Sequence, residues 1–153
     1  MKKCVLIVVA LFTLLLAGCE FDKPEMTTEQ FQAAMEAEGF TIDKSKDMDG
    51  KGKSVKRYLV AEKDGVTVNF LIYTSVERAI QAYTGMEKEY ESRKAASNLT
   101  SSSKFGMGNY NKFTLRYNDR YVLITRIGST MIFVGTQADR REWIAPLIEK
   151  MGY

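Results

Sequence analysis

The chain of 153 residues contains no histidine, and its two cysteines, Cys4 and Cys19, both lie at the N-terminal end. Without histidine or a further cysteine, the sequence excludes Ser-His-Asp and Cys-His catalytic sites, ordinary zinc sites and the usual haem ligands. Carboxylates, lysine, tyrosine and arginine remain, but these residue types occur on every soluble surface. The sequence therefore predicts no catalytic residue, no metal and no cofactor, and we expect the protein not to be an enzyme.

Charge is missing from one stretch near the N-terminus. Lys2 and Lys3 precede an uncharged apolar run from Val5 to Leu16, and two small residues follow it. A basic start, an apolar run and small residues before a cleavage point are the three parts of a secretory signal peptide. The uncharged segment from Cys4 to Gly18 is about fifteen residues long, whereas a membrane-spanning helix needs roughly 20. We therefore expect residues 1–18 to be a signal peptide; an uncleaved anchor and a buried helix are the alternatives.

The four residues Leu16-Ala17-Gly18-Cys19 end this segment. This match resembles the lipobox of bacterial lipoprotein precursors, and the resemblance is confined to the signal segment. In that class a diacylglyceryl group is attached to the cysteine sulfur, and cleavage leaves the cysteine as the new N-terminus. The resemblance implies acyl (palmitate-type) lipidation at Cys19. It also implies a location on the outer side of the cytoplasmic membrane, or at the outer membrane if the host has two membranes.

The basic balance of the chain depends partly on this signal segment. The precursor has 22 basic and 19 acidic residues and a net charge of +3, which falls to +1 when Lys2 and Lys3 are removed. A mature chain so close to neutrality lacks the excess of positive charge that is typical of nucleic-acid binding. We therefore expect no nucleic-acid partner.

Helix and turn signals divide the remainder into a tether and one domain. Residues 19–26 contain Pro24, which discourages a continuous helix, so we expect the lipidated cysteine and a short tether there. Thr27 and Gln30 have the spacing of a capping box and begin the single domain predicted over 27–153. A left-handed residue at a helix end is least costly for glycine, and Gly39 is expected to end this first helix.

Three tight turns predict antiparallel strands. Asp64-Gly65, Asn118-Asp119 and Gly128-Ser129 each separate β-rich runs, as expected for hairpins. The run from Ala95 to Asn109 is rich in serine and glycine and is expected to be a connector. The predicted fold is α+β, an antiparallel sheet with helices packed on one face, in the order α-βββ-α-βββ-α.

The two βββα halves show a short internal similarity. Residues 73–78 align with residues 135–140, which suggests two similar halves, although shared helix caps alone would produce the same match. Alternation along the strands places Phe70 of the first half on the predicted core face and Ile132 of the second half on the open face. Across the two halves the open face also carries tyrosines and an arginine, residue types enriched at binding hot spots. The possible partner-binding residues are Tyr58, Tyr73, Arg116 and Tyr121. A solvated sheet face built of strand-favouring residues is the alternative.

The sequence favours a lipid-anchored cell-envelope protein of unknown activity that acts as a non-catalytic binding or interaction module. A small-molecule or lipid carrier is the alternative, and a carboxylate-dependent hydrolase is less favoured. The expected partners are the membrane, through the lipid anchor, and an unidentified protein or other envelope component. A basic cluster could also touch anionic headgroups, although nearby acids favour an ordinary solvated loop; its members are Lys51, Lys53, Lys56 and Arg57.

Overall fold

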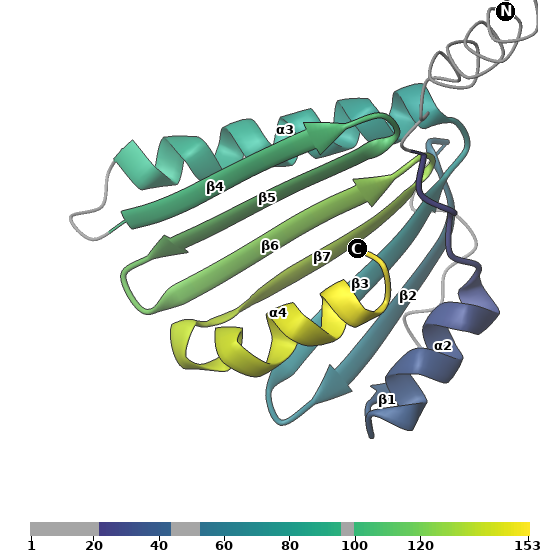
Figure 1. Cartoon of the computed structure of the whole chain (residues 1–153), viewed down its shortest axis with the longest axis horizontal. Helices are drawn as coiled ribbons and strands as arrows, with labels where there is room; N and C mark the ends of the chain where they lie inside the picture. The colour runs from purple at the N-terminus through teal and green to yellow at the C-terminus, as the bar shows by residue number, and fades with distance from the viewer. Residues whose placement is uncertain (1–21, 44–52, 96–99) are drawn as a thin grey trace, which may run out of the picture.

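The structure is a computed structural model that describes residues 22–43, 53–95 and 100–153 (Figure 1). The expected signal peptide and Cys19 lie outside the described residues, so their cleavage and lipidation stay predictions. Of the helices that the structure describes, none combines the length and the apolar character needed to cross a bilayer.

The described chain forms three α-helices and a seven-stranded sheet, and the predicted α+β class with an antiparallel sheet is confirmed. In chain order the elements are α2 (Thr28–Ala37), β1 (Thr41–Ile42), β2 (Val55–Lys63), β3 (Val66–Tyr73), α3 (Val76–Ala95), β4 (Thr100–Met107), β5 (Tyr110–Tyr117), β6 (Arg120–Ile127), β7 (Thr130–Gln137), the 3-10 turn η1 (Ala138–Arg140) and α4 (Arg141–Lys150).

Local signals placed most of these elements correctly. The Thr27 capping box is present, with both reciprocal hydrogen bonds to Gln30. Asp64 and Asn118 adopt positive φ values of 47° and 48°, as tight hairpin turns require. All strand pairs are antiparallel, and the order across the sheet is β1-β2-β3-β7-β6-β5-β4. The β3–β7 pair therefore joins the first half of the sheet to the second.

Strand β4 occupies part of the run that was expected to be a connector. It pairs with the whole length of β5, from Thr100 with Tyr117 to Met107 with Tyr110. Its side chains from Ser101 to Met107 are all exposed. Because this strand buries no side chain of that run, its first residues are serines rather than alternating apolar and polar residues, and the sequence shows no strand signal there. The second half consequently has four strands, and β4 forms one edge of the sheet.

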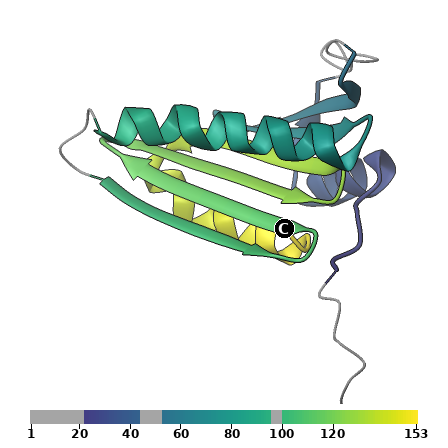
Figure 2. The ribbon, with the colours of Figure 1, turned by 90° about the horizontal axis from the view of Figure 1, so that it is seen from above.

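The helices are divided between the two faces of the sheet. Helices α2 and α4 pack on one face, whereas α3 covers the opposite face, where the sequence had predicted none (Figure 2). The two halves also differ in strand number, so the structure gives no support to two similar βββα units. We call the two sides the α2/α4 face and the α3 face.

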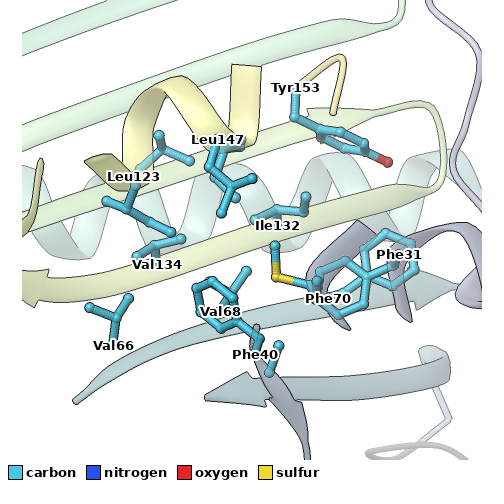
Figure 3. Close-up of a cluster of buried hydrophobic side chains, with 14 of the residues drawn as sticks. Phe31, Phe40, Val66, Val68, Phe70, Leu123, Ile132, Val134, Leu147 and Tyr153 are labelled. Atoms are coloured by element: carbon cyan, nitrogen blue, oxygen red, sulfur yellow. The ribbon is translucent and has the colours of Figure 1, made fainter. Parts of the chain in front are cut away.

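The register of the β3–β7 pair explains this arrangement. Within each half, alternation correctly separated the side chains of one sheet face from those of the other. The prediction matched the faces of the two halves wrongly, because the predicted core face of the first half continues into the predicted open face of the second. Phe70, an expected core residue, is paired with Ile132, which had been assigned to the open face. Both side chains are fully buried in the cluster under α2 and α4, where Phe70 stacks on Phe31 with ring centroids 4.7 Å apart (Figure 3).

Candidate functional site

The segment 22–26, which was expected to belong to a tether, is docked onto the domain. Asn109 makes three hydrogen bonds to it: its backbone N–H donates to the Asp22 carboxylate (3.0 Å), its Nδ2 donates to the Lys23 carbonyl (2.8 Å), and its Oδ1 accepts from the Lys23 N–H (2.9 Å). The Lys23 ammonium donates to the Gly152 carbonyl (2.7 Å) and lies 3.8 Å from the centre of the Tyr110 ring. The segment is therefore fixed to the β4–β5 turn and to the C-terminal end of the chain.

Glu25 provides a second attachment, to the β6–β7 turn. Its carboxylate accepts hydrogen bonds from the Ser129 backbone N–H (2.6 Å) and hydroxyl (2.8 Å). A Cβ added at Gly128 would lie 1.8 Å from the Glu25 carboxylate and would displace it, and the positive φ of 53° at this position also favours glycine. Next to it, burial raises the pKa of Tyr153 to about 12, and the phenol shares a hydrogen bond with the Thr130 hydroxyl.

A groove of about 460 Å³ lies between α2 and α4, and the docked segment forms part of its wall. Its apolar lining is Pro24, Met26, Ala34, Ala37, Leu147 and Met151, and its polar lining is Glu25, Gln30, Glu38 and Lys150. The buried side chains below it, drawn in Figure 3, form the core on this face of the sheet. The groove is thus an apolar hollow with a polar rim.

Helical spacing and side-chain size explain why the two helices leave this space. On α2, Phe31 and Met35 point onto the sheet and are fully buried, while Ala34 and Ala37 face the groove. Leu147 of α4 and Met151, the C-cap residue of that helix, are four residues apart and lie on one stripe. Since an alanine side chain is a single methyl group, Ala34 and Ala37 do not fill the space between the two helices.

An ion pair bridges the two helices at the rim of the groove. The Lys150 ammonium lies 2.8 Å from the Glu38 carboxylate. This hydrogen bond lowers the pKa of Glu38 and raises that of Lys150, so both groups are charged at neutral pH. Both side chains are exposed, and the pair therefore marks a charged edge beside the apolar lining.

A second hollow, of about 590 Å³, lies at the other end of the sheet. It is lined by Arg116, Asp119 and Arg120 near the β5–β6 turn, and by Asp139 and Glu142 near the start of α4. Its charges have both signs, and its lining is mostly polar. Within the described ranges, no group of three or more His, Cys, Asp or Glu side chains is arranged to hold a metal ion.

The four residues predicted to bind a partner do not form one surface. Tyr58 and Tyr73 are buried under α3 (9% and 7% exposed), and Tyr121 is buried in the α2/α4 cluster (3% exposed). Arg116 is exposed, and it lines the polar hollow. The prediction that these residues share an open face is wrong, because each face is covered by a helix and the tyrosines lie on opposite faces.

The groove was not predicted, and only a weak signal pointed to it. Ala34 and Ala37 stand beside the core positions Phe31 and Met35, which marks a helix flank with short side chains. That pattern does not show which element faces the flank. The relative position of α2 and α4 depends on contacts between the two ends of the chain.

Comparison with other proteins gives one distant likeness. No protein-family model matches the chain, and no curated protein matches it. A solved structure, a GTP binding regulator from Thermotoga maritima, is similar over 82% of this chain and 88% of its own, with a TM-score of 0.45 and 16% identity. A likeness of this degree carries no assignment of function.

Proposed function

We propose that the chain is a lipid-anchored cell-envelope protein that acts as a non-catalytic binding module, and that the groove between α2 and α4 takes an apolar group of its ligand. The groove itself is the observation that supports this proposal. Its volume of about 460 Å³ falls within the range of roughly 300–1,000 Å³ that is typical of small-ligand pockets. Met26, Leu147 and Met151 supply flexible or branched apolar contacts, and Glu38 and Lys150 supply a charged rim.

The position of the groove supports a ligand that comes from the membrane. Cys19 precedes Asp22 by three residues, which span at most about 10 Å. If Cys19 carries the lipid, Pro24 and Met26 bring the groove close to the bilayer surface. A lipid carrier is therefore the second candidate, because an acyl chain released from the bilayer would meet this groove first.

A tryptophan scan of two neighbouring alanines tests the groove. Ala34 lines it, whereas Ala33 is exposed on the outer surface of α2. With the apolar dye 1-anilinonaphthalene-8-sulfonate as the probe, Ala34→Trp should weaken binding about tenfold, a loss of about 1.4 kcal/mol. Ala33→Trp should leave the binding unchanged. Circular dichroism of both variants checks that the fold is retained, and equal dye binding by both would show that the groove is not the site.

The anchor is tested separately by intact-mass analysis of the protein in the membrane fraction. We expect Cys19 to be the N-terminal residue and to carry two or more acyl chains, because a single chain binds membranes only marginally. Cys19→Ser should remain an unlipidated precursor. An unmodified Cys19 in membrane-bound wild-type protein would refute the anchor and leave the groove proposal standing.

A further inference from the structure

Four large hydrophobic side chains remain exposed among the described residues. They are Val76 (40%), Ile80 (43%), Phe105 (48%) and Met107 (49%). Single exposed hydrophobic residues are ordinary on protein surfaces. These four, however, come from only two places, the first turns of α3 and the last residues of β4.

Both places lie at the end of the sheet where the N-terminal segment is docked. Met107 is two residues from Asn109, which holds Asp22 and Lys23. The Asn109 carbonyl accepts from the Gly128 N–H (2.9 Å), and the Ser129 carbonyl accepts from the Tyr73 N–H (2.9 Å). Helix α3 begins three residues after Tyr73. Figure 1 shows this common end, where β4 finishes and α3 starts.

On each of the two elements the exposed side chains lie close together along the chain. Two residues along a strand cover about 7 Å, which separates Phe105 from Met107. Four residues along a helix cover about 6 Å, which separates Val76 from Ile80. Peripheral helices bury their apolar face roughly 5–10 Å into a bilayer interface. Lys104 contacts Glu87 and Glu91 of α3 at 2.7 and 2.6 Å. Phe105, the next residue, therefore lies level with the middle of α3 and farther from this end than the other three. One membrane surface fits Val76, Ile80 and Met107.

Basic residues flank the same end. Lys53 and Lys56 are exposed beside Val55, the first residue of β2, and Val55 is paired with Tyr73. Lysines close to a membrane surface are attracted to anionic lipid headgroups. Apolar side chains together with lysines fit a bilayer surface.

We propose that this end of the domain rests on the bilayer, with Val76, Ile80 and Met107 inserted among the headgroups. The inference builds on the proposed anchor, because Cys19 can lie at most about 10 Å from Asp22, which is fixed to the same end. The domain then stands on the membrane with the Arg116 hollow facing away from it. The bilayer is the occupant that the tether favours over a protein partner.

Spin labels on the full chain test this orientation. In the mature protein with a lipidated Cys19, an introduced cysteine is the sole free thiol. Met107→Cys and Ile80→Cys probe the proposed contact, and Asp119→Cys, in the hollow at the other end, is the matched control. Each labelled protein is reconstituted into vesicles of phosphatidylethanolamine and phosphatidylglycerol. The expected result is preferential collision with oxygen at 107 and 80, and with a water-soluble nickel complex at 119.

Each alternative outcome has a distinct reading. Collision with the nickel complex at all three positions, on protein whose mass shows a lipidated Cys19, overturns the orientation and leaves the anchor intact. An unmodified Cys19 in the membrane-bound protein refutes the anchor and, with it, this inference. Dipolar broadening between labels at position 107, with or without vesicles, would show that a second copy covers this end and would overturn the proposal.

Discussion

The two faces of the sheet are covered in different ways. On the α3 face, one helix of 20 residues runs along the sheet, whereas the opposite face is shared by α2 and α4, each of 10 residues (Figures 1 and 2). A boundary between two helices can open into a groove, and here it does so because Ala34 and Ala37 are short. The division of one layer into two helices thus provides the ligand-sized hollow.

The faces differ in buried charge as well. The α3 side of β6 carries Arg126, which is 3% exposed and donates hydrogen bonds to the Asn111 amide oxygen and to the Gly128 carbonyl. Burial lowers the pKa of this guanidinium. On the α2/α4 face the buried centre is the apolar stack of Phe31 on Phe70. The buried, hydrogen-bonded arginine thus contributes to the structure of the α3 face, whereas the proposed binding site lies on the α2/α4 face.

The largest expected effects come from truncating one tyrosine on each face. Tyr73→Ser under α3 and Tyr121→Ser under α4 should each lower the free energy of unfolding by about 3–5 kcal/mol, the cost of truncating a large buried aromatic side chain. Urea unfolding measures both. Arg116→Ser, at an exposed position, should change the value by less than about 0.5 kcal/mol. A neutral Tyr73→Ser would contradict the burial of the sheet under α3.

Local sequence signals were sufficient for the hairpins and for the first helix cap. Asp64-Gly65 and Asn118-Asp119 set their turns through the backbone conformations that these residues tolerate, independently of the rest of the chain. Alternation likewise separated the two faces within each half. These features depend on residues close together in sequence, which is why they could be predicted.

The features that were predicted wrongly or not at all depend on contacts between residues far apart in the sequence. Pairing of Phe70 with Ile132 decides which face of one half continues into the other, and no local pattern encodes it. Strand β4 has serines at 101–103 and is recognised only by its pairing with β5. The groove and the docking of Asp22 onto Asn109 join opposite ends of the chain. The proposed lipidation of Cys19, in contrast, rests on sequence alone and stays a prediction.

Removing a hydrogen-bond acceptor of the buried Arg126 should lower the free energy of unfolding by an intermediate amount, through a contact on the α3 face. Asn111→Ala removes the amide oxygen that accepts from Nε and Nη2 of Arg126, and it leaves a buried guanidinium with fewer acceptors. We expect a loss of about 1.5–3 kcal/mol in urea unfolding, the range for hydrogen bonds to charged groups. Arg126→Lys keeps the charge but loses the planar fork, and should also destabilise. Unchanged stability in both variants would mean that this contact is not needed.

The dependence of stability on alkaline pH compares one buried tyrosine on each face, Tyr153 on the α2/α4 face and Tyr73 on the α3 face. Burial raises the pKa of each phenol from 10.0 to about 12, so the folded state retains protons that the unfolded state releases. Stability is therefore complete below pH 10 and falls as the pH rises from 10 to 12. For each phenol the loss should reach about 2–3 kcal/mol. Tyr153→Phe and Tyr73→Phe should therefore flatten this pH dependence by similar amounts; an identical slope in the wild type and both variants would contradict it.

The smallest effect on stability, and the sharpest test of which face binds, comes from two exposed lysines. Lys150 joins α4 to Glu38 of α2 at the groove, whereas Lys104 contacts Glu87 and Glu91 of α3 at 2.7 and 2.6 Å. Exposed ion pairs contribute little to folding, so neither Lys150→Ala nor Lys104→Ala should shift the thermal midpoint measurably.

Dye binding should separate these two variants. Without Lys150, the Glu38 carboxylate loses its ion-pair partner and repels an anionic ligand more strongly. Lys150→Ala should therefore weaken binding of 1-anilinonaphthalene-8-sulfonate severalfold at low salt, while binding of the uncharged N-phenyl-1-naphthylamine stays the same. Lys104→Ala should affect neither dye, because its ion pairs lie on the α3 side. An equal loss for both dyes in Lys150→Ala would show that the pair acts by spacing the helices, and a loss in Lys104→Ala would move the binding site to the α3 face.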